Sequence, residues 1–187
     1  GYIAEKVIEN AFATKVIISD ISEKCLNKAI KRLNENYKGM FTAVVSDGFD
    51  ELPHVDEALI SGMGGEIIIK MLSRREDKPS RLILQPMKNS DTLREYVIGD
   101  GYKIVRDYTF KDRKYYHVIV AEKSDEKDFY TADELMFGRD NLREKSSDFK
   151  SFIKDKITLF SEASSRAFSP EKEELEKKLE KLKEIIK

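Results

Sequence analysis

The stretch EALISGMGGEIIIKML, residues 57–72, decides the fold class of this protein. It begins with a short apolar run, EALIS, which is the length of a buried strand. Three glycines within the next four residues, 62–65, predict a sharp turn, because glycine adopts backbone conformations that other residues avoid. A helix is expected from there to about Leu72. A strand, a tight turn and a helix in succession are typical of α/β proteins.

Similar units lie on both sides of this stretch. Strands are expected in three other short apolar runs: KVIIS at 15–19, FTAVVS at 41–46 and RLILQ at 81–85, which Pro86 stops. Helices are expected at the start of the chain, after a Ser22 cap, and from about Ser90 to Ile98. The first two have apolar faces made by Ile3, Val7, Ile8, Ala11 and Phe12, and by Cys25, Leu26, Ala29, Ile30 and Leu33. Strands without polar alternation are covered on both faces, which predicts a parallel sheet with crossover helices.

The pattern changes after residue 101. The runs YKIVRDYTF at 102–110 and YYHVIVAEK at 115–123 are separated by four residues, which predicts a β-hairpin. A parallel α/β sheet that ends in an antiparallel strand is the layout of class I methyltransferases. A dinucleotide-binding dehydrogenase normally repeats parallel βα units instead.

Residues 124–187 form a segment rich in charge and without a strand-like run. Two heptad-like series of side chains predict helices that pack along a seam. They are Phe149, Ile153, Lys156, Phe160, Ala163 and Ala167, followed by Leu175, Leu179, Leu182 and Ile186. Ser169-Pro170 between them predicts an N-cap and a first-turn proline, and therefore an antiparallel helical hairpin. We expect a Rossmann-like domain at 1–123 and a helical, coiled-coil-like domain at 124–187.

Composition excludes several classes of protein. Lys and Arg number 34 and Asp and Glu 35, so an anionic partner must be met by local basic patches. No run of about 18 apolar residues exists, which argues against a helical membrane protein.

Cysteine and histidine are scarce. Cys25 is the single cysteine, so an intrachain disulfide and a cysteine-based zinc site are excluded, and we expect it in the core. His54 and His117 are expected to be structural, and no metal is expected. The chain begins at Gly1 without a methionine or a signal peptide, and we expect a reducing, cytoplasmic setting.

Acidic residues end two of the expected strands. Asp20 follows the first, where a carboxylate can accept the hydroxyl groups of a ribose, as in nucleotide-binding α/β folds. Asp47-Gly48 follows the second, where a carboxylate can accept the amino group of an adenine. Each of them alone is also consistent with an ordinary turn residue, and Asp20 would also suit NAD.

The glycine-rich turn and the next strand end have two interpretations each. Gly62 to Gly65 suit a backbone that passes close to a ligand, or a tight turn with close packing. No Gly-Lys-Ser/Thr follows, so the turn is not a P-loop. Gln85 can hydrogen-bond the edge of a base, or simply cap its strand with Pro86.

Basic residues cluster twice, at Arg74, Arg75, Lys78 and Arg81, and at Lys111, Arg113 and Lys114 beside two tyrosines. Such clusters can contact phosphates, or they can form a solvated charged face.

Taken together, these segments resemble the bacterial tRNA (adenine-22-N1)-methyltransferase family. The resemblance rests on GYIAEK at 1–6, SDIS at 19–22, SDGFDEL at 46–52, ISGMGGEII at 60–68, RLILQP at 81–86 and YYHVIVAE at 115–122. It covers nearly the whole chain, and the two-helix tail also fits.

The resemblance implies a fold, a cofactor and a set of site residues. The fold is a Rossmann-like class I methyltransferase sheet, parallel with an antiparallel last strand, plus a C-terminal helical hairpin. The cofactor is S-adenosylmethionine and the partner is tRNA. Apart from the resemblance, we expect a monomer or weak homodimer that binds no membrane and no metal. Cofactor-binding residues are then Gly1, Tyr2, Asp20, Ile21, Asp47, Gly48, Ser61 and Gly62. Catalytic residues near the methyl group are Gly62, Met63 and Gly64, and substrate-binding residues are Gly65, Gln85, Pro86, Arg74, Arg75 and Arg113.

The sequence departs from the family in two places. The family's first strand and its Asp-x-Gly-x-Asp-His loop precede the Gly-Tyr-Ile segment, and this sequence starts at Gly1. We expect a fragment that is inactive without that loop. Met87 also stands where relatives commonly have a polar residue.

The implied reaction is in-line methyl transfer to N1 of adenine, which carries a lone pair and needs no general base. Two other classes remain open from the residues alone. One is an NAD-dependent oxidoreductase, which Asp20 allows. The other is a non-catalytic scaffold that binds a protein or itself through the helical tail.

Overall fold

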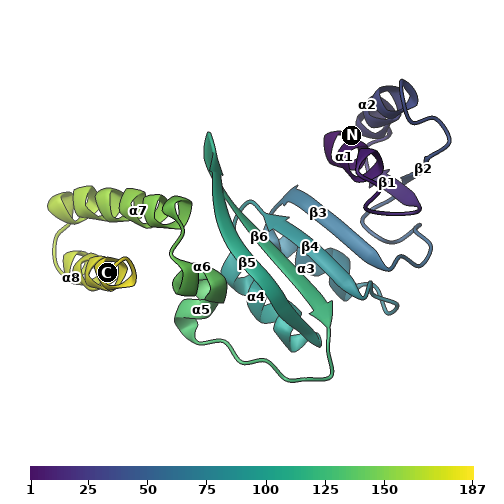
Figure 1. The fold of residues 1–187 in the computed structure, drawn as a ribbon. Coiled ribbons are helices and arrows are strands. Elements are labelled where there is room, and N and C mark those ends of the chain that lie inside the picture. The colour runs from purple at the N-terminus through teal and green to yellow at the C-terminus, as the bar shows by residue number, and fades with distance from the viewer. The chain divides into compact units, whose positions relative to one another are not determined.

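A computed structural model describes all residues from Gly1 to Lys187. They divide into two compact units, shown as ribbons in Figure 1. The first comprises Gly1–Val55 and Lys70–Lys78, and the second comprises Asp56–Ile69 and Pro79–Lys187. The strands form two sheets, one of two strands and one of four.

The first unit is built from α1 (Tyr2–Glu9), β1 (Val16–Asp20), α2 (Glu23–Asn34) and β2 (Phe41–Val45). β1 and β2 are parallel, as predicted, and the register places Asp20 opposite Val45. The Ser22 hydroxyl accepts a hydrogen bond from the Cys25 backbone N–H at 3.4 Å, which confirms the predicted cap of α2.

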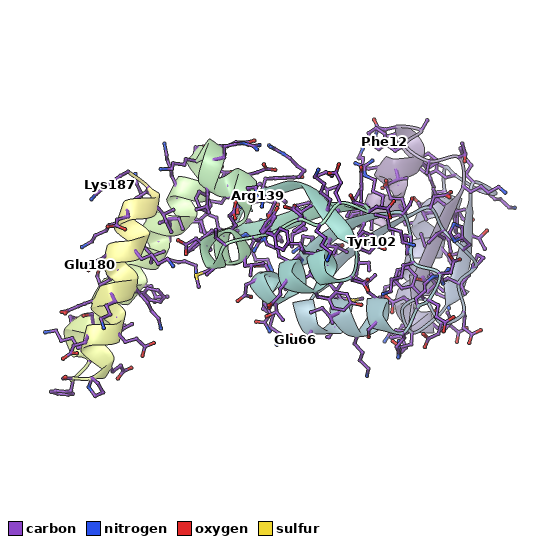
Figure 2. All side chains as sticks on the ribbon, turned by 90° about the horizontal axis from the view of Figure 1, so that it is seen from below. Phe12, Glu66, Tyr102, Arg139, Glu180 and Lys187 are labelled. Carbon is purple, nitrogen blue, oxygen red and sulfur yellow. The ribbon has the colours of Figure 1, made fainter.

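Two predictions about apolar faces in this unit are wrong. Cys25 is exposed, because α2 buries Leu26 and Leu33 and Cys25 lies to the side of that stripe. The opening helix ends at Glu9, because Ala11 has a left-handed backbone conformation with a φ of 52°. Phe12 therefore lies beyond the helix, 77% exposed at the surface (Figure 2).

The second unit contains β3 (Glu57–Met63), β4 (Arg81–Pro86), β5 (Tyr102–Asp112) and β6 (Lys114–Lys123) in the order β3-β4-β6-β5. β3 and β4 are parallel, and β6 is antiparallel to both β4 and β5, which confirms the predicted change of direction. Helices α3 (Gly65–Ser73) and α4 (Ser90–Gly99) follow β3 and β4. The predicted four-residue hairpin loop is shorter in the structure, where Asp112 pairs with Lys114 and Arg113 alone forms the turn.

The helical tail contains α5 (Ala132–Phe137), α6 (Arg139–Glu144), α7 (Ser147–Arg166) and α8 (Glu171–Ile185). Phe149 and Ile153 near the start of α7 share a buried cluster with Leu182 near the end of α8. This arrangement confirms the predicted antiparallel hairpin.

Details of the tail differ from the prediction at three places. Ala167 lies beyond α7, and the cap position of α8 is Pro170 and not Ser169. The short helices α5 and α6 were not predicted. Thr131 and Glu134 form a capping box at the start of α5, a local signal that could have revealed it.

Side chains of the tail hold the outer edge of β5. An edge strand leaves alternate backbone N–H groups without a strand partner. Three such donors bind tail oxygens: Asp107 N to Asp140 Oδ2 at 2.9 Å, Thr109 N to Asn141 Oδ1 at 2.9 Å, and Lys111 N to Asp148 Oδ2 at 3.0 Å. The tail is thus joined to the sheet along the second half of β5.

A buried ion pair adds to this joint. Arg94 on α4 donates to both carboxylate oxygens of Asp107 on β5, at 2.6 and 3.0 Å, and both side chains are almost wholly buried. Arg94 also donates to the carbonyl of Leu135 on α5 at 2.8 Å. One side chain therefore links α4, β5 and the tail.

None of the eight helices combines the length and the apolar character needed to cross a bilayer.

His117 predicts how stability depends on pH. Burial, reinforced by the charges of Arg94 and Lys156, lowers the pKa of His117 from 6.5 to about 4. The unfolded chain therefore binds more protons than the folded chain between these values, and stability falls as pH drops from 6.5 to 4. We expect His117 to account for a loss of about 3 kcal/mol in the free energy of unfolding over this range.

Urea denaturation at several pH values measures this effect. His117→Gln should flatten the dependence of stability on pH between 6.5 and 4 relative to the parent. If the stability of His117→Gln and of the parent depended equally on pH, the lowered pKa of His117 in the folded protein would be contradicted.

Candidate functional site

Two loops meet at the carboxyl ends of β3 and β4. The strands are parallel, with Ser61 opposite Gln85, so their ends reach the same edge of the sheet. Backbone hydrogen bonds join the loops: Met87 N donates to Met63 O at 2.7 Å, and Gly65 N donates to Lys88 O at 3.0 Å. In α/β sheets this edge is where ligands bind.

Gln85 holds the first of the glycines. The Gly62 N–H donates to Gln85 Oε1 at 3.1 Å, and the sheet register shifts between Ser61 and Met63. Gly62 has a φ of 79°, which strongly favours glycine. Part of the predicted turn is therefore a bulged end of β3. The Gln85 side chain binds the Gly62 backbone in the structure, and its contact with a base remains a prediction.

Close packing explains why residue 65, the last of these glycines, has no side chain. A Cβ atom at Gly65 would lie 2.3 Å from the carbonyl oxygen of Asn89, far inside contact distance. At Gly64 the nearest atom would be Cε of the flexible Lys88 side chain, at 3.0 Å. Asn89 also bonds Glu66, which projects from the start of α3 (Figure 2). Lys88, Asn89 and Glu66 were missed from the sequence, because only the folded loops bring them together.

The acidic strand ends of the first unit lie on neighbouring strands, as predicted. Asp20 ends β1, and its backbone carbonyl accepts from the Ser46 N–H at 3.2 Å, directly before Asp47. Asp20 Oδ1 accepts from the Ser22 N–H at 2.8 Å, as a turn aspartate would. A carboxylate has about four acceptor positions, so Asp20 retains capacity for a ligand.

Asp47 is paired with a residue that was predicted to bind substrate. Arg74 donates to Asp47 Oδ2 at 3.1 Å and to the Asp47 carbonyl at 2.9 Å, and the side-chain hydrogen bond raises the pKa of the guanidinium. Gly48 has a φ of 69°, and a Cβ there would lie 2.9 Å from the Met71 side chain. The strand end thus requires glycine for packing as well as for backbone conformation.

Arg75 organises the loop after β2. It donates to the carbonyls of Phe49 and Leu52 at 3.2 Å each and of Pro53 at 2.8 Å. The structure thus gives Arg75 a role within its own unit, and its predicted phosphate contact remains a prediction.

The predicted site residues fall into two groups. Those in the first unit are Gly1, Tyr2, Asp20, Ile21, Asp47, Gly48, Arg74 and Arg75. Those in the second are Ser61, Gly62, Met63, Gly64, Gly65, Gln85, Pro86 and Arg113. Ser61 to Gly65 lie beside Gln85 and Pro86, whereas Arg113 lies at the turn of the β5–β6 hairpin. That both groups serve one pocket remains a prediction.

The parallel β1–β2 pair, the β3-β4-β6-β5 sheet and the acidic strand ends define the class of Rossmann-like methyltransferases. Solved structures show the same fold. M. capricolum TrmK in complex with S-adenosylhomocysteine is 22% identical with a TM-score of 0.85, covering 99% of this chain and 86% of that one. The B. subtilis m1A22 tRNA methyltransferase TrmK is 24% identical with a TM-score of 0.82, covering 100% and 88%.

The chain belongs to the TrmK family, tRNA (adenine(22)-N(1))-methyltransferase, whose family model matches residues 1–187. The Bacillus subtilis tRNA (adenine(22)-N(1))-methyltransferase is 29% identical over 145 residues, which is 74% of this chain and 61% of that protein. A Mycoplasma genitalium relative is 30% identical over 128 residues, covering 66% and 58%. The chain spans about three fifths of the length of these two curated relatives. The resemblance stated from the sequence is confirmed.

The two neighbouring glycines predict different responses to alanine. Gly65→Ala should lower the free energy of unfolding by about 1–3 kcal/mol, because its Cβ meets the rigid Asn89 backbone. Gly64→Ala should change it by less than about 0.5 kcal/mol, because the Lys88 side chain can move aside. Urea denaturation of both variants measures the difference, and equal effects would refute the interlocked arrangement of the loops.

Proposed function

We propose that this protein transfers a methyl group from S-adenosylmethionine to N1 of an adenine in tRNA, at position 22 as in the family's description. The observation that carries the proposal is the family match over residues 1–187. The interlocked loops at the ends of β3 and β4 support it, because they offer a rigid backbone surface at the sheet edge where α/β enzymes bind ligands.

The available side chains suit the adenosine part of this cofactor. Its ribose hydroxyls and its adenine amino group are hydrogen-bond donors, and the strand ends of the first unit offer the carboxylates of Asp20 and Asp47 as acceptors. Gly48 would let backbone approach the base. When bound, S-adenosylmethionine supplies an electrophilic methyl group on a sulfonium. M. capricolum TrmK binds the corresponding product, S-adenosylhomocysteine.

The chain's own contribution to the reaction is orientation. N1 of neutral adenine already carries the attacking lone pair, so no side chain has to remove a proton. Holding two reactants in attack geometry can supply about 7–11 kcal/mol. Within Gly62 to Gly64, the carbonyls of Met63 and Gly64 already accept backbone hydrogen bonds from Met87 and from Ile67 and Ile68. The Gly62 carbonyl would therefore face the adenine amino group and stabilise the growing positive charge. Gln85 would keep that backbone in place through its bond to Gly62.

Recognition of tRNA requires contacts away from the reacting base. A base within the stacked core of tRNA must be extruded, at a cost of a few kcal/mol. The basic clusters and the helical tail beyond residue 123 are proposed to provide these contacts. A cytoplasmic location and a monomeric or weakly dimeric state accord with this function.

Methyl incorporation tests the proposal directly. The full-length protein with labelled S-adenosylmethionine should methylate unmodified tRNA, and replacing the adenine at position 22 by guanine should abolish incorporation. Gly64→Ala should lower turnover at least about tenfold, because a methyl side chain at the loop displaces the reacting groups. Unchanged turnover and cofactor affinity would remove the loop from the mechanism, and incorporation into neither tRNA would refute the function.

Asp20 should contribute to cofactor affinity. Asp20→Asn exchanges a charged acceptor for a neutral one, and calorimetry with S-adenosylhomocysteine should show affinity lowered about tenfold or more. Asp125→Asn, at an exposed aspartate of the second unit, should bind like the parent. Equal affinity of all three proteins would exclude the proposed ribose contact, and tight binding of NAD instead would favour an oxidoreductase.

A further inference from the structure

The β5–β6 hairpin extends past the sheet edge that carries the candidate loops. β6 pairs with β4 only from Ile119 to Glu122, and Ile119 lies opposite Leu84. Because the two strands are antiparallel, Lys114 to Val118 continue beyond Leu84 in the direction of the carboxyl end of β4. Figure 1 shows the hairpin reaching beyond β3 and β4. Its tip therefore stands on the same side as the Gly62–Gly65 loop.

The tail covers one face of this projecting hairpin. The rings of Tyr115 and His117 lie 5.3 and 5.0 Å from the ring of Phe152 on α7, centroid to centroid. The Tyr115 hydroxyl also donates to Asp155 Oδ2 at 2.6 Å. This face belongs to the internal packing of the unit.

The opposite face carries a ladder of aromatic rings. Phe110 and Tyr116 are cross-strand partners whose rings stack at 5.2 Å with 17° between their planes. Tyr108 continues the ladder, 6.4 Å from Phe110. Tyr108 is 36% and Phe110 37% exposed, so rings that a core would bury remain accessible.

Lysine connects this aromatic ladder (Tyr108, Phe110 and Tyr116) to the candidate site. Lys114 Nζ lies 5.2 Å from the Tyr116 ring and 4.0 Å from Sδ of Met87. Met87 in turn donates its backbone N–H to Met63 of the glycine-rich loop. Arg106 lies over the Tyr108 ring at 5.7 Å while it also bonds Glu144. The aromatic rings and basic side chains of the hairpin are therefore connected through Lys114 and Met87 to the Gly62–Gly65 loop.

We propose that the aromatic ladder binds an unpaired stretch of the RNA substrate, with bases stacked on Phe110 and Tyr116 and a phosphate held by Lys114. This site rests on the proposed function, since it receives nucleotides next to the base that enters the Gly62–Gly65 loop. Exposed rings combined with cations are the usual platform for single-stranded nucleic acid, because every base offers a flat face. Extrusion of the target base leaves its neighbours unstacked, and the ladder replaces their lost stacking.

Leucine substitutions test the ladder in the full-length protein. Phe110→Leu and Tyr116→Leu keep apolar bulk but remove the ring, and each should weaken binding of unmodified tRNA and of a short single-stranded RNA about tenfold. Tyr116→Phe keeps the ring and should bind like the parent. Phe129→Leu, at an aromatic residue that is 78% exposed outside the ladder, is the matched control and should have no effect.

The salt dependence of RNA binding tests the phosphate contact of Lys114. Loss of one phosphate contact to a single strand should reduce the slope of log K against log salt concentration by about 0.7. We therefore expect a smaller slope for Lys114→Gln and an unchanged slope for Phe110→Leu. Melting temperatures establish whether each variant is folded. If a leucine variant is unfolded, Lys114→Gln still tests the site, because it and Tyr116→Phe preserve the packing.

The outcomes separate this site from the proposed function. Parent-like RNA binding by Phe110→Leu and Tyr116→Leu, in a protein whose parent methylates tRNA, overturns the ladder and leaves the function intact. A parent that transfers no methyl group refutes the function, while tenfold weaker binding of single-stranded RNA by the leucine variants would still support the ladder. A change in sedimentation without a change in RNA binding would make the ladder a protein interface and overturn the proposal.

Discussion

The open edge of β5 is the constraint on which the arrangement of the second unit depends. A strand at the edge of a sheet presents backbone donors that must find acceptors, or the strand invites pairing with another chain. Here the acceptors are the side chains of Asp140, Asn141 and Asp148. Because they lie on α6 and in the first turn of α7, satisfying the strand also places the tail along it. The same bonds set α7 against one face of the hairpin.

The buried pair of Arg94 and Asp107 makes this joint specific. Two charges removed from water are stable only when their hydrogen bonds are satisfied, and a misplaced partner would leave an uncompensated charge. Arg94 meets this condition with the Asp107 carboxylate and the Leu135 carbonyl. Correct docking of α5 is therefore tied to correct packing of α4 on β5, so the tail and the sheet depend on each other.

The candidate site follows from a similar condition on the backbone. The ends of β3 and β4 exchange hydrogen bonds through Met63, Gly65, Met87 and Lys88, and Gln85 adds a side-chain acceptor for Gly62. Loops joined in this way have few alternative conformations. A reaction that needs no proton transfer depends mainly on orientation, and such loops can hold a reacting group without rearranging.

Local patterns in the sequence determined the strands and longer helices, the Ser22 cap, the direction of the hairpin and the pairing of α7 with α8. Each of these depends on residues close together in the chain or on a repeated apolar spacing. The density of glycines at 62–65 also predicted the turn that follows β3, whereas its role at a site remains a prediction from the family strings. Only the tertiary structure decided that Cys25 is exposed, that Gln85 bonds Gly62, and that one face of the hairpin is covered and the other open. These facts depend on partners distant in the chain, whose contacts leave no periodic trace in the sequence.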